Sequence, residues 1–236
     1  MKAICVRIFI DIQMVLFYID TVEKQNLIKH GDTIMEKESI ELHTLWHIDA
    51  MIQPYPVTIV TTMDEQGNIN AGAYSLVLPF CSTSRKHPQM LLISNAAWHT
   101  AKNIEATGEF VLNYPRADQL NDINETGRFY PAGENELDHT KYTTIPSNVV
   151  CPPRIAECYQ HLECRLHEIL RPSQHQCNII GEVVDLSLDA GLYAMPRNER
   201  IQKVNVPIYY GVDAEHRHIY GMIEDIRAVP FDPKVD

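Results

Sequence analysis

Several signatures of common enzyme classes are absent from this sequence of 236 residues. It contains no G-x-G-x-x-G, which disfavours a Rossmann dinucleotide site, and no G-x-S-x-G elbow of an α/β-hydrolase. Gly67 and Gly72 have the spacing of a phosphate loop, but Ala73 and Tyr74 stand where lysine and serine or threonine are required. Residues 167–168 begin a zinc-protease motif that no second histidine completes. Nucleotide hydrolysis and these hydrolase mechanisms are therefore unsupported.

Positive charge is also scarce. The chain has 20 lysines and arginines against 31 aspartates and glutamates, a formal net charge of -11, and a pI of about 5.4. The field of such a protein repels phosphate backbones, so nucleic acid is an unexpected partner. A small anionic ligand would have to be held by a local cluster of donors.

Long apolar runs are missing as well. Residues 3–19 are rich in apolar types but are broken by Arg7 and Asp11, too often for a spanning helix of about 20 residues. No small-residue cleavage site follows, so a secretory signal fits poorly and we expect a cytoplasmic protein without a membrane anchor. Met35 opens a polar stretch, and we expect residues 1–34 to be an N-terminal extension outside the fold of a single domain at 35–236.

The cysteines lack the close spacing of structural zinc sites. We expect them to be reduced core thiols; they are Cys5, Cys81, Cys151, Cys158, Cys164 and Cys177. His216 and His218 could ligate a metal, but their polar surroundings favour an exposed turn. The sequence thus predicts no metal site.

The first half of the chain is rich in strand signals. Residues 56–62 are dense in β-branched types, residues 64–68 have a tight-turn composition, and residues 69–78 are again strand-like. This pattern predicts a β-hairpin. Residues 90–94 and 109–113 are short apolar runs typical of buried strands.

Two helices are expected between and after these strands. Residues 99–106 follow Trp98 with Thr100 as the predicted N-cap, and residues 107–108 supply the stop. A second helix is predicted over residues 116–125. The region 129–153, full of Pro, Gly, Asn and Asp, is predicted to form long loops.

Residues 155–170 satisfy both helical and strand spacing, so periodicity alone leaves the two open. We favour a strand, because residues 171–175 make a turn and residues 178–188 return as a long β-rich segment. Residues 207–211 give one more strand, and residues 215–218 a polar turn. Six or seven strands, two or three short helices and no repeated βαβ order together favour an antiparallel barrel.

Two segments could hold a ligand, residues 70–75 and 94–104. Ala71 and its small neighbours Gly72 and Ala73 would let the backbone approach a flat ring closely. Free N–H groups and a positive dipole end at the helix start, with Lys102 nearby, suit a phosphate monoester. The alternative is an ordinary tightly packed strand followed by an ordinary cap, with Trp98 either in the core or acting as a lid.

The order of these segments carries a resemblance. A Pro-Val strand, an Asp/Gly turn, the strand Asn-Ala-Gly-Ala-Tyr-Ser and a loop ending in Thr-x-x-Asn-Ile precede Thr-Gly-Glu-Phe-Val-Leu-Asn. Over residues 52–212 this order resembles the flavin reductase-like family, which includes flavoredoxins, archaeal ferric reductases and the reductase components of two-component monooxygenases. The resemblance implies a mainly β fold: an FMN-binding split β-barrel, a Greek-key antiparallel barrel with a few short peripheral helices.

The resemblance also implies site residues. Those that would border the flavin ring and ribityl chain are Asn70, Ala71, Ala73, Tyr74 and Ser75. Those that would hold the lower chain and phosphate are Ser94, Asn95, Thr100, Lys102 and Asn103. Lys141 would be a second contact for a phosphate or a nicotinamide. Residues 96–99 depart from the family, because they replace a more charged approach to the threonine.

The activity that the resemblance implies is reduction of FMN, or of ferric iron, with NADH or NADPH as the electron donor. Hydride transfer to flavin N5 needs stacked rings and no catalytic triad, so no catalytic side chain is predicted. A homodimer and a monooxygenase or another redox protein as partner are implied in the same way. Two alternatives stay open: a flavoredoxin-like carrier with tightly bound FMN that takes electrons from a protein donor, and a non-enzymatic flavin-binding module.

Overall fold

The computed structural model of the chain describes residues 28–30, 33–35, 37–42, 50–81, 87–131 and 133–229. The chain divides into two units, residues 1–46 and 47–236. In the first unit the described strands are β1 (Ile28–His30) and β2 (Thr33–Met35), which pair with each other in antiparallel fashion. Most of the predicted extension at residues 1–34 lies outside the described residues.

The second unit is built around a seven-stranded sheet. Its strands are β4 (Thr58–Met63), β5 (Ile69–Tyr74), β6 (Val77–Cys81), β7 (Gln89–Asn95), β8 (Glu109–Tyr114), β11 (Gln160–Leu170) and β12 (Gln176–Leu188). They lie in the spatial order β5-β4-β8-β11-β12-β7-β6, and each neighbouring pair is antiparallel.

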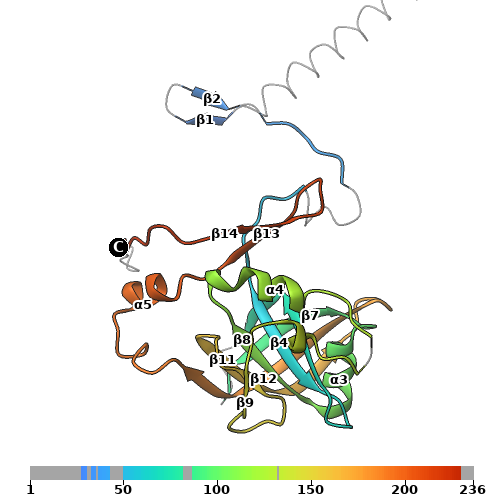
Figure 1. Cartoon of the computed structure of the whole chain (residues 1–236). Helices are drawn as coiled ribbons and strands as arrows, with labels where there is room; N and C mark the ends of the chain where they lie inside the picture. The colour runs from blue at the N-terminus through green and yellow to red at the C-terminus, as the bar shows by residue number, and fades with distance from the viewer. Residues whose placement is uncertain are drawn as a thin grey trace, which may run out of the picture. The chain divides into compact units, whose positions relative to one another are not determined.

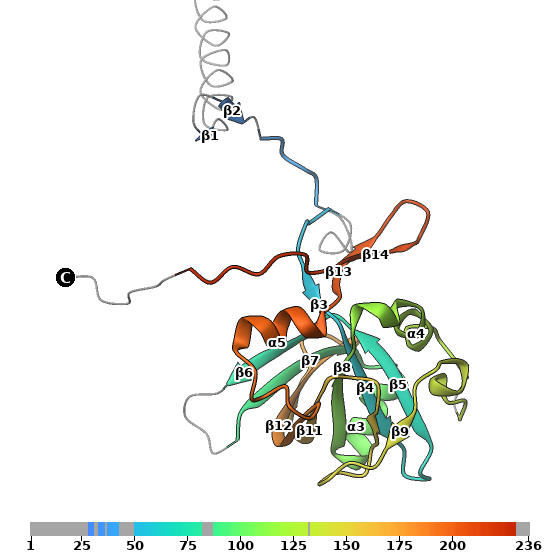
Figure 2. The ribbon, with the colours of Figure 1, turned by 60° about the vertical axis from the view of Figure 1, so that its left-hand side comes forward.

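The two edge strands of this sheet are neighbours in the chain. Only Ser75 and Leu76 separate the end of β5 from the start of β6, and so few residues span at most about 11 Å. The opposite edges must therefore meet at this corner, and the sheet curls into a half-open barrel (Figures 1 and 2). The predicted antiparallel barrel is confirmed, but the prediction of one strand over residues 69–78 is wrong, because the chain changes edge at Ser75.

The remaining elements decorate this barrel. The short strands are β3 (Tyr55–Pro56), β13 (Ile208–Val212) and β14 (His218–Gly221) in a three-stranded sheet, and the pair β9 (Thr144–Ile145) and β10 (Arg154–Ile155). The helices are α3 (His99–Thr107), α4 (Leu120–Thr126) and α5 (Arg197–Val204), with 3-10 turns η1 (Ala117–Gln119) and η2 (Glu136–His139). The second predicted helix thus corresponds to η1 and α4.

Helix α3 packs against the curled sheet, where it contacts β4, β5, β7 and β11. Its Ala101 and Ile104 are buried in the main core with residues such as Phe110. Gly108 ends the helix as predicted, with φ of 73° and its N–H donating to Ile104 O at 2.9 Å. The predicted N-cap is wrong: Trp98 occupies that position, and Thr100 lies inside the first turn.

The long hairpin β11–β12 confirms the choice of strand over helix for the ambiguous segment. Leu162 and Cys164 of β11 face the main core. His161 and Glu163, which point to the other face, are also buried. Alternating residues are buried on both sides because the segment that follows β9 packs over the outer face.

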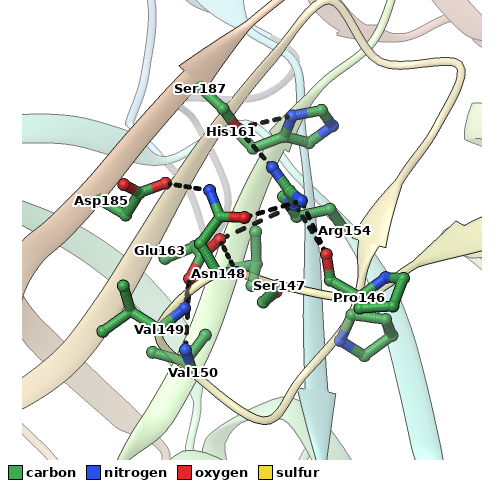
Figure 3. Close-up of polar contacts among 12 residues, drawn as sticks. Pro146, Ser147, Asn148, Val149, Val150, Arg154, His161, Glu163, Asp185 and Ser187 are labelled. Carbon is green, nitrogen blue, oxygen red and sulfur yellow. Dashed lines mark hydrogen bonds and ion pairs between the residues drawn. The ribbon is translucent and has the colours of Figure 1, made fainter.

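A buried carboxylate fixes that segment to the sheet (Figure 3). Glu163 is 0% exposed and accepts backbone N–H groups at 2.7, 2.6 and 3.2 Å from residues 148–150. The Nε of Arg154 lies 3.7 Å from the same carboxylate, and its terminal nitrogens donate to Pro146 O at 2.7 Å and Ser187 Oγ at 3.0 Å. Since each partner is a donor, the buried charge is compensated on every side.

His161 in the same cluster is expected to make the fold sensitive to acid. Its Nε2 lies 2.8 Å from Ile155 O and its Nδ1 lies 3.3 Å from Ser187 Oγ, so the neutral ring donates to the carbonyl and accepts from the hydroxyl. Burial, with a further contribution from Arg154, lowers the pKa of His161. Below about pH 6.5, His161 therefore binds a proton in the unfolded chain more readily than in the folded chain. The free energy of unfolding falls as the pH drops through that range.

Denaturant unfolding at about pH 7.5 and 5.5 measures this effect. We expect His161→Gln to reduce the loss of unfolding free energy between the two pH values, while His175→Gln, at an exposed position, leaves the loss unchanged. An identical pH dependence in wild type and His161→Gln would contradict the assignment.

The prediction that the cysteines lie in the core is confirmed in part. Cys158, Cys164 and Cys177 are buried, but Cys151 is exposed, and the predicted core position is wrong for it. Cys5 lies outside the described residues. Across the portion of the chain that is described, no helix is both long and apolar enough to cross a membrane.

Candidate functional site

A cavity lies where the free edge of β5 meets the start of α3, the end of α4 and η2. It encloses about 690 Å³ of space not filled by protein atoms, a volume that includes open solvent. Its lining residues are Asn70, Gly72, Ala73, Tyr74, Ala97, Trp98, His99, Thr100, Thr126, Gly127, Arg128, Phe129, Tyr130 and Glu136. We call it the β5 cavity.

One wall of the β5 cavity is an unpaired strand edge. The N–H of Ala71 donates to Glu136 Oε2 at 2.9 Å, so on this side a side chain takes the place of a neighbouring strand. Backbone groups two residues apart point to the same side, so those of Ala73 are directed to the same free edge. A Cβ at Gly72 would lie 3.0 Å from Tyr74 Cε2 and 3.2 Å from Thr100 Oγ1. The strand therefore presents backbone groups over a surface with no room for a larger residue at position 72.

Three polar side chains form the floor of the cavity. The Asn70 amide lies 3.1 Å from both the Thr100 hydroxyl and the Glu136 carboxylate. Both contacts are satisfied when Asn70 Oδ1 accepts from Thr100 and Nδ2 donates to Glu136 Oε1. Burial raises the pKa of Glu136 although the Ala71 N–H opposes the shift. This network ties η2 to both β5 and α3.

The N-terminus of α3 opens into the same cavity. Its cap residue Trp98 makes no side-chain capping bond, and the first turn carries no acidic residue. The N–H groups of that turn and the positive end of the helix dipole suit an anion such as a phosphate. His99 and Arg128 add side chains that can carry positive charge at the cavity wall.

Aromatic rings form the mouth of the cavity. The Trp98 centroid lies 5.9 Å from that of Tyr74 and 5.8 Å from that of Phe129. Trp98 is 39% exposed and Phe129 is 82% exposed. Trp98 thus lies at the mouth of the cavity, which agrees better with the predicted role as a lid than with a position in the core. Flat apolar surfaces of this kind suit a planar ring.

The structure brings most of the predicted site residues to this region. Asn70, Ala73, Tyr74 and Thr100 line the β5 cavity, and Ser75 lines an adjacent one. Two others contact lining side chains: Ala71 through Glu136 and Ser94 through the Tyr74 hydroxyl at 3.0 Å.

Like Ala71 and Ser94, the remaining four predicted residues lie outside the linings of both cavities. Asn95 Oδ1 accepts the Ala97 N–H at 2.9 Å in the turn before α3, and Asn103 donates to a threonine hydroxyl of β4 at 3.1 Å. Lys102 and Lys141 are exposed. His99 and Arg128, which were not predicted as site residues, line the β5 cavity.

Sequence reasoning missed the residues that come from loops, above all Glu136, Arg128 and Phe129. Loops carry binding residues out of proportion to their length, and within the predicted loop region 129–153 only Lys141 is an expected site residue. An acidic residue directly before an apolar one, as in Glu136-Leu137, is the one local signal that could have drawn attention to this turn.

An adjacent cavity of about 620 Å³ shares Ala73, Tyr74 and Gly127 with the β5 cavity. Its other side is formed by Tyr209, His218 and Tyr220 and their neighbours. Among the residues with described placement, no group of three or more His, Cys, Asp or Glu side chains is arranged to hold a metal ion.

The chain is similar to known proteins in both sequence and structure. Residues 51–205 match the model of the flavin reductase like domain. A protein of Methanothermobacter thermautotrophicus is 32% identical over 143 residues, which are 59% of this chain and 66% of the relative. The chain therefore spans just under two thirds of that relative.

Solved structures give the same picture at lower identity. A flavin reductase with a split barrel domain from Shewanella frigidimarina has a TM-score of 0.68 at 21% identity, covering 81% of this chain and 94% of that chain. Nitrilotriacetate monooxygenase component B from Bacillus cereus has a TM-score of 0.68 at 20% identity, covering 82% and 100%. Flavoredoxin of Desulfovibrio vulgaris has a TM-score of 0.66 at 21% identity, covering 84% and 98%. The fold is thus a split barrel, and because the family model matches well over half of its residues, the chain belongs to the flavin reductase-like family.

Proposed function

We propose that the chain binds FMN in the β5 cavity and catalyses its reduction by NADH or NADPH. The observation that carries this proposal is the meeting, in one cavity, of an unpaired strand edge with an uncapped helix N-terminus. The first provides paired donors and acceptors for the polar edge of a ring, and the second provides donors for a phosphate. The flavin itself would supply the redox chemistry, accepting a hydride at N5.

Different residues of the cavity would contact different parts of FMN. The backbone of β5 around Ala73 would contact the polar edge of the ring, and Gly72 would allow the close approach. Trp98 and Phe129 would cover the ring and exclude water. The first turn of α3, with His99 and Arg128, would hold the phosphate. Hydride transfer to the flavin would require no proton donor or nucleophile from the protein.

The adjacent cavity offers a place for the electron donor. Because it shares Ala73 and Tyr74 with the β5 cavity, a second ring there would lie close to the first. Hydride transfer needs the reacting atoms about 3–3.5 Å apart. Two cavities that share a wall could hold the two rings at such a short distance.

Anaerobic mixing of the purified protein with FMN and NADH or NADPH tests the proposal. Bleaching of the flavin with multiple turnover of added FMN is the expected result. Bleaching only by a protein donor would instead support the flavoredoxin-like carrier, to which the similarity with flavoredoxin points. Bleaching by neither would support a non-enzymatic flavin-binding module, and a colourless protein that gives no heat on titration with FMN would overturn the proposal.

Thr100→Val is expected to weaken FMN binding by about 1–3 kcal/mol, because the Asn70 amide loses its hydrogen-bond partner at the cavity floor. Calorimetric titration with FMN measures the change. Thr107→Val is the matched control, since the Thr107 hydroxyl bonds only the helix backbone at the far end of α3. Equal dissociation constants for wild type and Thr100→Val would count against placing the ligand beside this hydroxyl.

The assembly and location of the protein are further proposals. Leu78 and Phe80 on edge strand β6 are 44% and 51% exposed, and such apolar surface on a strand edge supports a homodimer. A monooxygenase is a candidate recipient of reduced FMN, by analogy with component B from Bacillus cereus. We also propose a cytoplasmic location, and a functional domain that begins after residue 34.

A further inference from the structure

The β5 cavity contains a buried acid where an anionic ligand is proposed. Glu136 is 5% exposed and lines the cavity. Its two direct partners, the Ala71 N–H at 2.9 Å and the Asn70 amide at 3.1 Å, are both uncharged. His99 favours the ionised form of the carboxyl, whereas burial and the nearby Glu134 oppose it. Among the residues with described placement, no lysine or arginine forms an ion pair with this carboxylate, as Arg154 does with Glu163.

The fold holds Glu136 firmly in this place. The preceding Asn135 caps η2, its Oδ1 accepting the Leu137 N–H at 3.1 Å. Leu137 is buried in the second core cluster with Ala71 of β5 and Tyr142. With the neighbouring residue anchored on each side, the Glu136 side chain is directed to the free edge of β5, where it accepts the Ala71 N–H.

We propose that Glu136 is a specificity-determining residue for the redox state of the bound flavin, disfavouring the reduced form relative to the oxidised form. The inference rests on the proposed function. Hydride transfer from a dihydronicotinamide adds two electrons and one proton to the neutral oxidised ring and leaves an oxidised nicotinamide. The reduced ring therefore carries one negative charge that the oxidised ring lacks.

Two like charges in one low-dielectric cavity raise each other's free energy. The carboxylate thus weakens binding of reduced flavin, or it takes up a proton when the flavin is reduced. Either outcome costs free energy only in the reduced state. The consequence is release of reduced FMN to an acceptor, which distinguishes a reductase from a carrier that keeps its flavin.

The test uses Glu136→Gln with Glu134→Gln as the matched control. Glutamine keeps an oxygen that can accept the Ala71 N–H but removes the charge. Glu134 lies in the same segment, is exposed and is outside the cavity lining. Dissociation constants for oxidised and for reduced FMN are measured anaerobically at about pH 8, because alkaline pH favours the ionised form of a carboxyl group.

We expect Glu136→Gln to tighten binding of reduced FMN relative to oxidised FMN by about tenfold, equivalent to a potential about 30 mV higher for a two-electron couple. The Glu134→Gln variant should keep the wild-type ratio. If both forms bind to wild type and to Glu136→Gln with the same ratio, the inference is wrong while the proposed function stands. If the wild-type protein does not bind oxidised FMN at all, the proposed function itself is wrong, and the inference is wrong with it. Should Glu136→Gln not fold, Glu136→Met, which also removes the charge, gives the same comparison.

Discussion

Replacement of Glu163 by alanine is expected to lower the free energy of unfolding by about 3–5 kcal/mol, the largest effect on stability that we expect from a single substitution in this chain. The change leaves three backbone N–H groups of residues 148–150 without their acceptor. It also leaves the Arg154 guanidinium, 15% exposed, without its carboxylate. Each buried group left without a partner carries its full desolvation cost.

Denaturant unfolding of Glu163→Ala beside Glu163→Gln measures this effect. Glutamine keeps one acceptor oxygen, so its loss should be smaller than that of alanine. A loss below about 1 kcal/mol for alanine would mean that the segment after β9 contributes little to the folded state and that its N–H groups find water instead.

Substitution of Gly72 by valine is expected to weaken FMN binding at least tenfold, which corresponds to about 1.4 kcal/mol or more. Even the Cβ of alanine would lie 3.0 Å from the Tyr74 ring and 3.2 Å from the Thr100 hydroxyl, so both cavity residues must move. Valine adds two methyl groups on the surface that the ring would approach. Gly72→Ala should therefore give a smaller loss in the same direction.

Calorimetric titration with FMN measures both Gly72 variants, and their thermal unfolding serves as the control for a folded barrel. If Gly72→Val is folded and binds FMN as wild type does, the ring does not lie against β5, and the proposed site is wrong. This result would leave the family membership and the fold untouched.

The two carboxylates that are buried in the described part of the chain have different surroundings. Glu163 meets three backbone N–H groups and an arginine, as expected of a group that fixes a loop. Glu136 meets one backbone N–H and a neutral amide, and it faces a cavity. A buried acid without a full counter-charge costs stability, so its presence at a ligand cavity favours a role in binding.

Local sequence signals predicted the elements whose stability is local. The β-branched residues of 58–62 and the turn at 64–68 predicted the first hairpin, and in the structure Asp64 accepts the Asn68 N–H at 2.8 Å. Gly108 predicted the end of α3, because a left-handed residue there costs glycine little. The choice of a strand for residues 155–170 depended on the turn and the returning strand beside it, and the observed strand covers residues 160–170 of that segment.

Other features had no local signature. Residues 69–78 read as one strand because their composition is uniform, yet the closure of the barrel breaks them at Ser75. Thr100 looked like a helix cap because caps favour threonine, but its hydroxyl is used by Asn70, 30 positions earlier in the chain. Lys102 and Lys141 were expected at the site as nearby charges, whereas the structure brings His99 and Arg128 there.

By itself, the sequence determined the class of this protein: an antiparallel barrel with short helices, and two segments, β5 and the start of α3, rich in small and hydrogen-bonding residues. These follow from side-chain alternation, turn composition and helix stop signals, which act over a few residues. Only the tertiary structure decided that the two segments share one cavity, and that Phe129 and Glu136 complete it. Those contacts join residues tens of positions apart, and their geometry depends on how the sheet curls and where the loops pack.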